Sequence, residues 1–158
     1  MRATPLIPGI VHRREIMEMI ADRRVRFSTL WLFATLNYLY ADIVTLMDPT
    51  FLNQIMVGQV GSIEMTQGFL FGAAVLMETA IAMVLLSRVL GYRANRWANM
   101  IVGAIHTLAV AASVLLGDGV PAPYYLFFAT IEVSCTLLII GYAWKWKEGG
   151  DATSSAEA

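Results

Sequence analysis

Residues 66–87 read TQGFLFGAAVLMETAIAMVLLS, an almost unbroken apolar segment with one charged side chain, Glu78, near its middle. A transmembrane helix needs about 20 predominantly apolar residues. This segment has that length, and it therefore decides the fold class. It also raises the functional question, because an acidic side chain at the centre of a bilayer costs about 2.5–3.5 kcal/mol on insertion scales.

The composition of the whole chain agrees with a membrane protein. The chain has 158 residues, a length typical of one domain, of which 58% are apolar and 15% charged. Soluble domains contain about 45–50% apolar and about 25% charged residues. The single cysteine, Cys135, excludes an internal disulfide. Because there is no phosphate-binding loop, zinc-type spacing or nucleic-acid motif, we do not expect nucleic acid as a partner.

Four segments are long and apolar enough to cross a bilayer, and the connections between them contain Gly, Pro or charged residues that end a membrane segment. The sequence therefore predicts an all-α polytopic membrane protein, a four-helix bundle within residues 28–146. In the outer connection, Asp48 and Pro49 predict the N-cap and first residue of a short helix. The predicted spans are about 28–47, 66–87, 97–117 and 124–144.

Along the chain, terminal or connecting segments that contain Lys and Arg alternate with connections that contain neither. These residues lie before the first span, between the second and third spans, and after the fourth, whereas the first and third connections contain none. The excess of basic residues in cytoplasmic segments predicts that both termini are cytoplasmic. We expect residues 1–27 to include an amphipathic helix on the cytoplasmic leaflet, with a soluble helical arm as the alternative. Residues 147–158 lack apolar periodicity, which predicts a disordered cytoplasmic tail.

Each predicted span carries a stripe of polar, small or aromatic residues spaced three and four apart, so that the members share one face. A rise of about 1.5 Å per residue places Glu78, His106 and Glu132 at similar depth near the midplane. We expect these side chains to meet and to share a proton. The ligand-binding or proton-binding residues predicted from the stripes are Asp42, Glu78, His106, Glu132, Tyr38 and Tyr125.

Other interpretations of the polar residues remain open. Polar side chains in membrane helices often only join helices by hydrogen bonds, and we favour this interpretation for Asn37, Asn99, Thr35 and Ser113. Converging Glu, His and Asp residues could bind a metal ion. However, no helix carries the Glu-x-x-His pair of di-iron bundles. We therefore predict no metal and no cofactor.

The leading functional hypothesis is a membrane protein that binds or transports a small hydrophobic or cationic molecule, coupled to protons. One alternative is a membrane-embedded enzyme, an isomerase or a redox protein, acting on a lipid-soluble substrate. Another is an accessory or structural subunit. The expected partners are the lipid bilayer, an unidentified small molecule and a second copy of the chain in a homodimer. Arg88, Arg93 and Arg96 are expected to meet lipid phosphates and fix the topology.

Four sequence blocks resemble an uncharacterised family of small bacterial four-span membrane proteins, over roughly residues 27–146. The blocks are STLWLFATLNYLYADI, TQGFLFGAAVLMET, LSRVLGYRANRW and FFATIE. The resemblance implies a multi-pass protein of the bacterial inner (cytoplasmic) membrane, but it brings no substrate and no catalytic residues. The general plan is also similar to that of DoxX-like four-helix membrane proteins, which is a likeness of fold and not of function.

Overall fold

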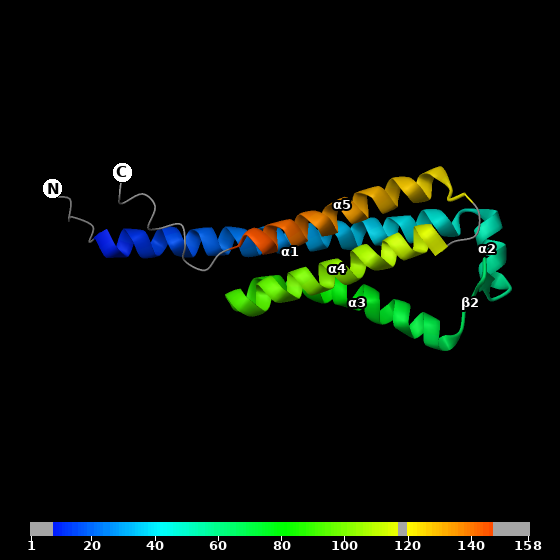
Figure 1. Ribbon diagram of the computed structural model, residues 1–158, viewed down its shortest axis with the longest axis horizontal. Helices are drawn as coiled ribbons and strands as arrows, with labels where there is room; N and C mark the ends of the chain where they lie inside the picture. Colours follow the sequence, from blue (N-terminus) through cyan, green and yellow to red (C-terminus); the bar gives the residue numbers. More distant parts are fainter. Residues whose placement is uncertain (1–7, 117–119, 147–158) are drawn as a thin grey trace.

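The computed structural model describes residues 8–116 and 120–146 (Figure 1). The described part is mainly helical, as predicted, and the three later helices begin and end close to the expected spans. The expected disordered tail at residues 147–158 lies outside the described residues. The elements are α1 (Pro8–Leu46), α2 (Pro49–Met56), β1 (Gln59–Val60), β2 (Ile63–Glu64), α3 (Gln67–Val89), α4 (Tyr92–Leu116) and α5 (Pro123–Lys145).

The N-terminal segment differs from the expectation. Instead of a separate helix along the cytoplasmic leaflet, the chain forms one continuous helix, α1, of 39 residues. Its first part extends beyond the C-terminal end of α5 (Figure 1). The physical reason is that no Gly or Pro follows Gly9 before the end of α1, so nothing in the sequence breaks the helix between the basic and apolar segments. The expected position of this part on the cytoplasmic leaflet stays a prediction.

The outer connection follows the sequence closely. Asp48 caps α2 by accepting a hydrogen bond of 2.9 Å from the backbone N–H of Thr50, and Pro49 is the first residue of the helix. The bond from Thr50 is the main cause that holds the pKa of Asp48 below its ordinary value. The Tyr124 hydroxyl donates to the other Asp48 oxygen at 3.2 Å. The predicted cap therefore also ties the beginning of α5 to the end of α1.

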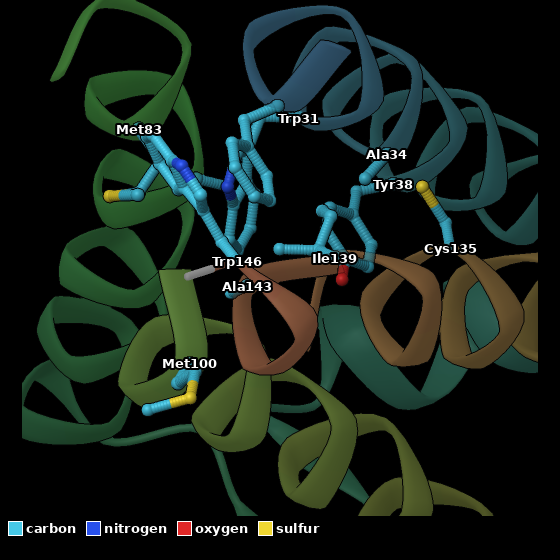
Figure 2. Packing of buried hydrophobic residues seen from close by; sticks show 11 residues of the cluster. Trp31, Ala34, Tyr38, Met83, Met100, Cys135, Ile139, Ala143 and Trp146 are labelled. Atoms are coloured by element: carbon cyan, nitrogen blue, oxygen red, sulfur yellow. The ribbon is translucent and has the colours of Figure 1, made fainter. Parts of the chain in front are cut away.

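Packing is uneven among the long helices. α4 packs along α5, α1 packs against both α3 and α5, and α3 meets α4 only slightly. The hydrophobic core lies where α1, α3 and α5 come together, and Figure 2 shows Trp31, Met83 and Ile139 within it. All three side chains are at most 2% exposed. The core therefore holds α1, α3 and α5 together near the C-terminal ends of α3 and α5.

The first half of α3 diverges from the other helices (Figure 1). Residues 67–75 are all exposed, whatever face of the helix they occupy. The buried residues of α3 are confined to its second half, at Ala80, Met83 and Ser87. Only the second half of α3 is therefore packed against the other helices.

The exterior of the described structure is strongly apolar. α3, α4 and α5 are each long and apolar enough to cross a membrane, and the bent pair of α1 and α2, at 88°, passes the same test together. Large side chains such as Phe33, Phe71 and Leu108 are more than half exposed. A soluble protein rarely exposes contiguous apolar surface of this extent. The exterior is that of a protein whose helices face lipid.

Gly103 lets α4 and α5 approach closely. A Cβ atom at this position would lie 3.0 Å from the Ile140 Cγ1 atom of α5. We expect Gly103→Val to lower the free energy of unfolding by about 2 kcal/mol, because overpacking forces neighbouring atoms to move. Gly72→Val is the matched control, since a Cβ there would meet no atom within 4 Å. Unfolding in mixed micelles measures both variants, and equal losses would contradict the close contact.

Candidate functional site

The imidazole of His106 is the centre of a polar site inside the bundle. The side chain is 1% exposed and comes from α4. Tyr38 of α1 stacks on it, with ring centroids 5.4 Å apart, and Trp31 of α1 meets it edge-on at 5.6 Å. From α3, the Thr79 hydroxyl lies 3.1 Å from His106 Nε2. Three helices thus converge on one ring.

The hydroxyl of Thr79 makes two close polar contacts at this site. The Thr79 hydroxyl donates to the Leu76 carbonyl at 2.6 Å, which uses its single hydrogen. The same oxygen lies 3.1 Å from His106 Nε2, so Thr79 links the imidazole of α4 to the backbone of α3.

Glu132 of α5 adds a carboxyl group to this site. It is 6% exposed, and its Oε1 atom has no hydrogen-bond partner among the described residues. The Tyr38 hydroxyl is likewise buried without a partner there. The two groups lie within electrostatic range of each other, and Asp42 lies within range of Glu132. Since buried polar atoms are normally hydrogen-bonded, the pair marks a place where a donor or a cation would be stabilised.

Hydrogen bonds of nearby side chains join the part of α5 around Glu132 to its neighbouring helices. The Cys135 thiol donates to the Leu30 carbonyl of α1 at 3.3 Å. The hydroxyls of Thr107 and Thr136 lie 2.7 Å apart and join α4 to α5. The position of Glu132 is therefore set from both neighbouring helices.

The structure brings together only some of the predicted site residues. Tyr38, His106 and Glu132 are buried, with Tyr38 stacked on His106, and the exposed Asp42 lies within electrostatic range of Glu132. Glu78 is exposed, and its neighbour Thr79 contacts His106 instead. The structure therefore does not bring Glu78 together with Glu132 and His106, and the role of Glu78 as a site residue stays a prediction.

The physical reason for this difference lies in the uniformly apolar composition of α3. One residue turns a helix by about 100°, so a stripe aligned on Glu78 misses the face that carries Ala80, Met83 and Ser87. Near the middle of α3, the only polar neighbour of Glu78 is the adjacent Thr79. The sequence therefore offers no polar residue one turn away that would show which face of α3 is buried. A shared proton that includes Glu78 is not supported by this geometry.

Tyr125 is also separate from the buried site. Its hydroxyl donates to Ser113 Oγ at 2.6 Å and joins the outer parts of α5 and α4. It precedes Glu132 by seven residues, or about 10 Å along the helix. Its role in ligand binding stays a prediction, but its position is that of a residue joining two helices.

A second polar cluster was not predicted as a unit. Trp31 Nε1 donates to Asn99 Oδ1 at 2.7 Å, Asn99 Nδ2 donates to Asn95 Oδ1 at 2.6 Å, and Asn95 Nδ2 donates to the Ser87 carbonyl at 2.6 Å. All four residues are fully buried. The sequence feature that could have predicted this cluster is the spacing of Asn95 and Asn99, which places both on one face of α4. The interpretation of Asn99 as a residue that joins helices is confirmed, and Trp31 connects this cluster to His106.

The three arginines expected at lipid phosphates lie at the end of the bundle where α4 begins. Arg88 Nε donates to Ser28 Oγ at 2.9 Å, and an Arg96 nitrogen donates to the Trp144 carbonyl at 3.3 Å. Arg88 and Arg93 are exposed. Arg88 and Arg96 thus also hold neighbouring helices, while the headgroup contacts of all three stay a prediction.

The site combines an imidazole, a phenol and a carboxyl group from three helices, lined by aromatic rings. Among the side chains that the structure describes, no three of the His, Cys, Asp or Glu types lie close enough to hold a metal ion. The groups present can exchange a proton, accept hydrogen bonds from a ligand and stabilise positive charge. These are the properties of a binding or proton-transfer site.

Together, the apolar exterior and the buried polar site define a helical membrane protein with three helices, or four with the bent pair, able to cross a bilayer. The chain belongs to a family of unknown function, DUF6326, whose model matches residues 14–153. This confirms the expected membership of an uncharacterised family. The search of curated proteins and the search of solved structures found no match.

Proposed function

We propose that the chain is a four-span protein of the bacterial inner membrane that binds a small hydrophobic ammonium ion between Tyr38, His106 and Glu132 and exchanges it for a proton. α1, α3, α4 and α5 are the spans, and the basic end faces the cytoplasm. The observation that supports the proposal is the buried Oε1 of Glu132, which, like the Tyr38 hydroxyl within electrostatic range of it, has no hydrogen-bond partner among the described residues.

The chemistry of these groups favours a protonated amine. An ammonium N–H can donate to Glu132 Oε1, and this charge-assisted bond is stronger than a bond between neutral groups. The rings of Tyr38 and Trp31 stabilise a cation placed against their faces. When no ligand is bound, a proton on Glu132 keeps the buried carboxyl neutral. Arrival of the cation then releases that proton, which couples binding to proton transfer.

Binding of two matched probes tests the proposal. We expect benzylammonium to bind the protein in phosphatidylcholine nanodiscs at least about tenfold more tightly than benzyltrimethylammonium, which has the same ring and charge but no N–H donor. Calorimetry in two buffers of different ionisation enthalpy should show about one proton released for each benzylammonium bound. Equal affinities, or no binding of either probe, would contradict the proposal.

Mass spectrometry of small molecules that copurify with the protein distinguishes the alternative functions. A hydrophobic amine supports the proposal. A quinone or an isoprenoid instead favours the membrane-embedded enzyme. If no small molecule copurifies and neither probe binds, the structural subunit is favoured. Gentle extraction in native lipid particles is needed, since detergent displaces lipid-soluble ligands.

A further inference from the structure

A small cleft lies between α1 and α5, at the basic end of the bundle. Its volume is about 210 Å³, and it is separate from the buried site around His106. α1 contributes three of its lining residues and α5 the other two. The cleft is lined by Arg23, Arg26, Phe27, Tyr142 and Lys145.

The charge of this cleft is strongly positive. Three of the five lining residues are cationic and none is acidic. Arg26 pairs with Asp22 at 2.8 Å, one turn earlier on α1, but both side chains are about 60% exposed. Such a surface pair contributes little and leaves guanidinium donors available. The cleft therefore suits an anion with several acceptor oxygens.

The cleft also has an aromatic wall. Phe27 is 2% exposed and packs against Trp146 at a centroid distance of 5.6 Å, whereas Tyr142 is about half exposed. The next exposed residues towards the middle of α5 are apolar, as at Leu138. Cationic groups thus stand directly beside a surface that faces acyl chains.

We propose that this cleft binds the phosphate group of an anionic phospholipid. Guanidinium groups bind phosphate oxygens in a bidentate manner, and Lys145 adds a point charge. The aromatic wall and the adjacent apolar surface contact the glycerol and acyl chains, which a free phosphate lacks. Basic pockets between helices at a membrane surface are suited to such headgroups. This inference does not rest on the proposed function of the buried site.

Native mass spectrometry of the full chain tests this site. The protein is extracted from nanodiscs that contain equal amounts of phosphatidylglycerol and phosphatidylcholine. We expect at least about tenfold more retained phosphatidylglycerol, and a loss of about fivefold in Arg23→Gln and in Lys145→Gln. Arg24→Gln is the matched control, because it removes one charge from the neighbouring position of α1, outside the lining of this cleft.

Each result decides for or against the site. Equal loss in Arg24→Gln and the two cleft variants would show an effect of general surface charge and overturn the proposal. Binding of inorganic phosphate at millimolar concentration without a preference for phosphatidylglycerol would show a free-anion site and overturn the lipid assignment. Tyr142→Phe keeps the ring and the net charge, so retention within about twofold is expected if the cations dominate. Retention unchanged in every cleft variant would also overturn the proposal.

Discussion

Replacement of Glu132 by glutamine is expected to weaken benzylammonium binding by about a hundredfold and to abolish the accompanying proton release. The substitution keeps the shape of a side chain that is 6% exposed but removes its charge and its titrating proton. Loss of one member of a buried, hydrogen-bonded charge pair costs about 2–5 kcal/mol in binding, which corresponds to a factor of about 30 to 4,000 and includes the expected hundredfold loss. Calorimetry in nanodiscs measures both the affinity and the proton count.

Glu78 provides the matched control for this experiment. The same substitution, Glu78→Gln, removes a carboxyl group predicted to lie at similar depth but exposed on α3. We expect its affinity to stay within about twofold of the unchanged protein. If Glu78→Gln loses binding and Glu132→Gln does not, the site lies on α3 and the proposed function is wrong. Binding that is unchanged in both variants would exclude either carboxyl as the ligand's partner.

The second large effect concerns stability. We expect Asn99→Ala to lower the free energy of unfolding by about 3 kcal/mol. The substitution removes the acceptor of the Trp31 indole and the donor to Asn95, both fully buried. Each buried polar group left without a partner costs about 1–3 kcal/mol. Steric trapping or unfolding in mixed micelles measures the change.

Asn37→Ala is the control for Asn99→Ala. The Asn37 side chain donates only to the Phe33 carbonyl of its own helix, at 3.1 Å, and is not fully buried. We expect a change within about 0.5 kcal/mol. A similar loss in the two variants would mean that the cluster around Asn99 does not hold the helices together. The indole fluorescence of Trp31 should also shift in Asn99→Ala, because its N–H loses its partner.

Much of the fold could be predicted from apolar length alone. The predicted spans at 66–87, 97–117 and 124–144 correspond to α3, α4 and α5, because Gly, Pro and charged residues stand at their ends. The Asp48 cap was also predictable, since it depends on neighbouring residues only. The continuity of α1 was not, because a change of composition from basic to apolar need not break a helix.

The candidate site was predictable only where a helix carries several polar residues. In α1 and α5, Trp31, Tyr38 and Glu132 align with other stripe residues, and the buried faces were found. In α3 the residues around Glu78 are apolar on every face of the helix, so hydrophobic periodicity could not show whether Glu78 or Thr79 faces the other helices. The divergence of the first half of α3 depends on packing between distant segments. No pattern of neighbouring residues predicts this divergence.

The continuity of α1 has a mechanical consequence. In the four-span arrangement, the part from Pro8 to about Phe27 continues the membrane part as one rigid rod, about 30 Å long at 1.5 Å per residue. A tilt of about 20° within the bilayer would move the far end of this rod by about 10 Å. In the proposed four-span arrangement, a reorientation of α1 around Tyr38 and His106 would therefore produce a larger displacement at its N-terminal end.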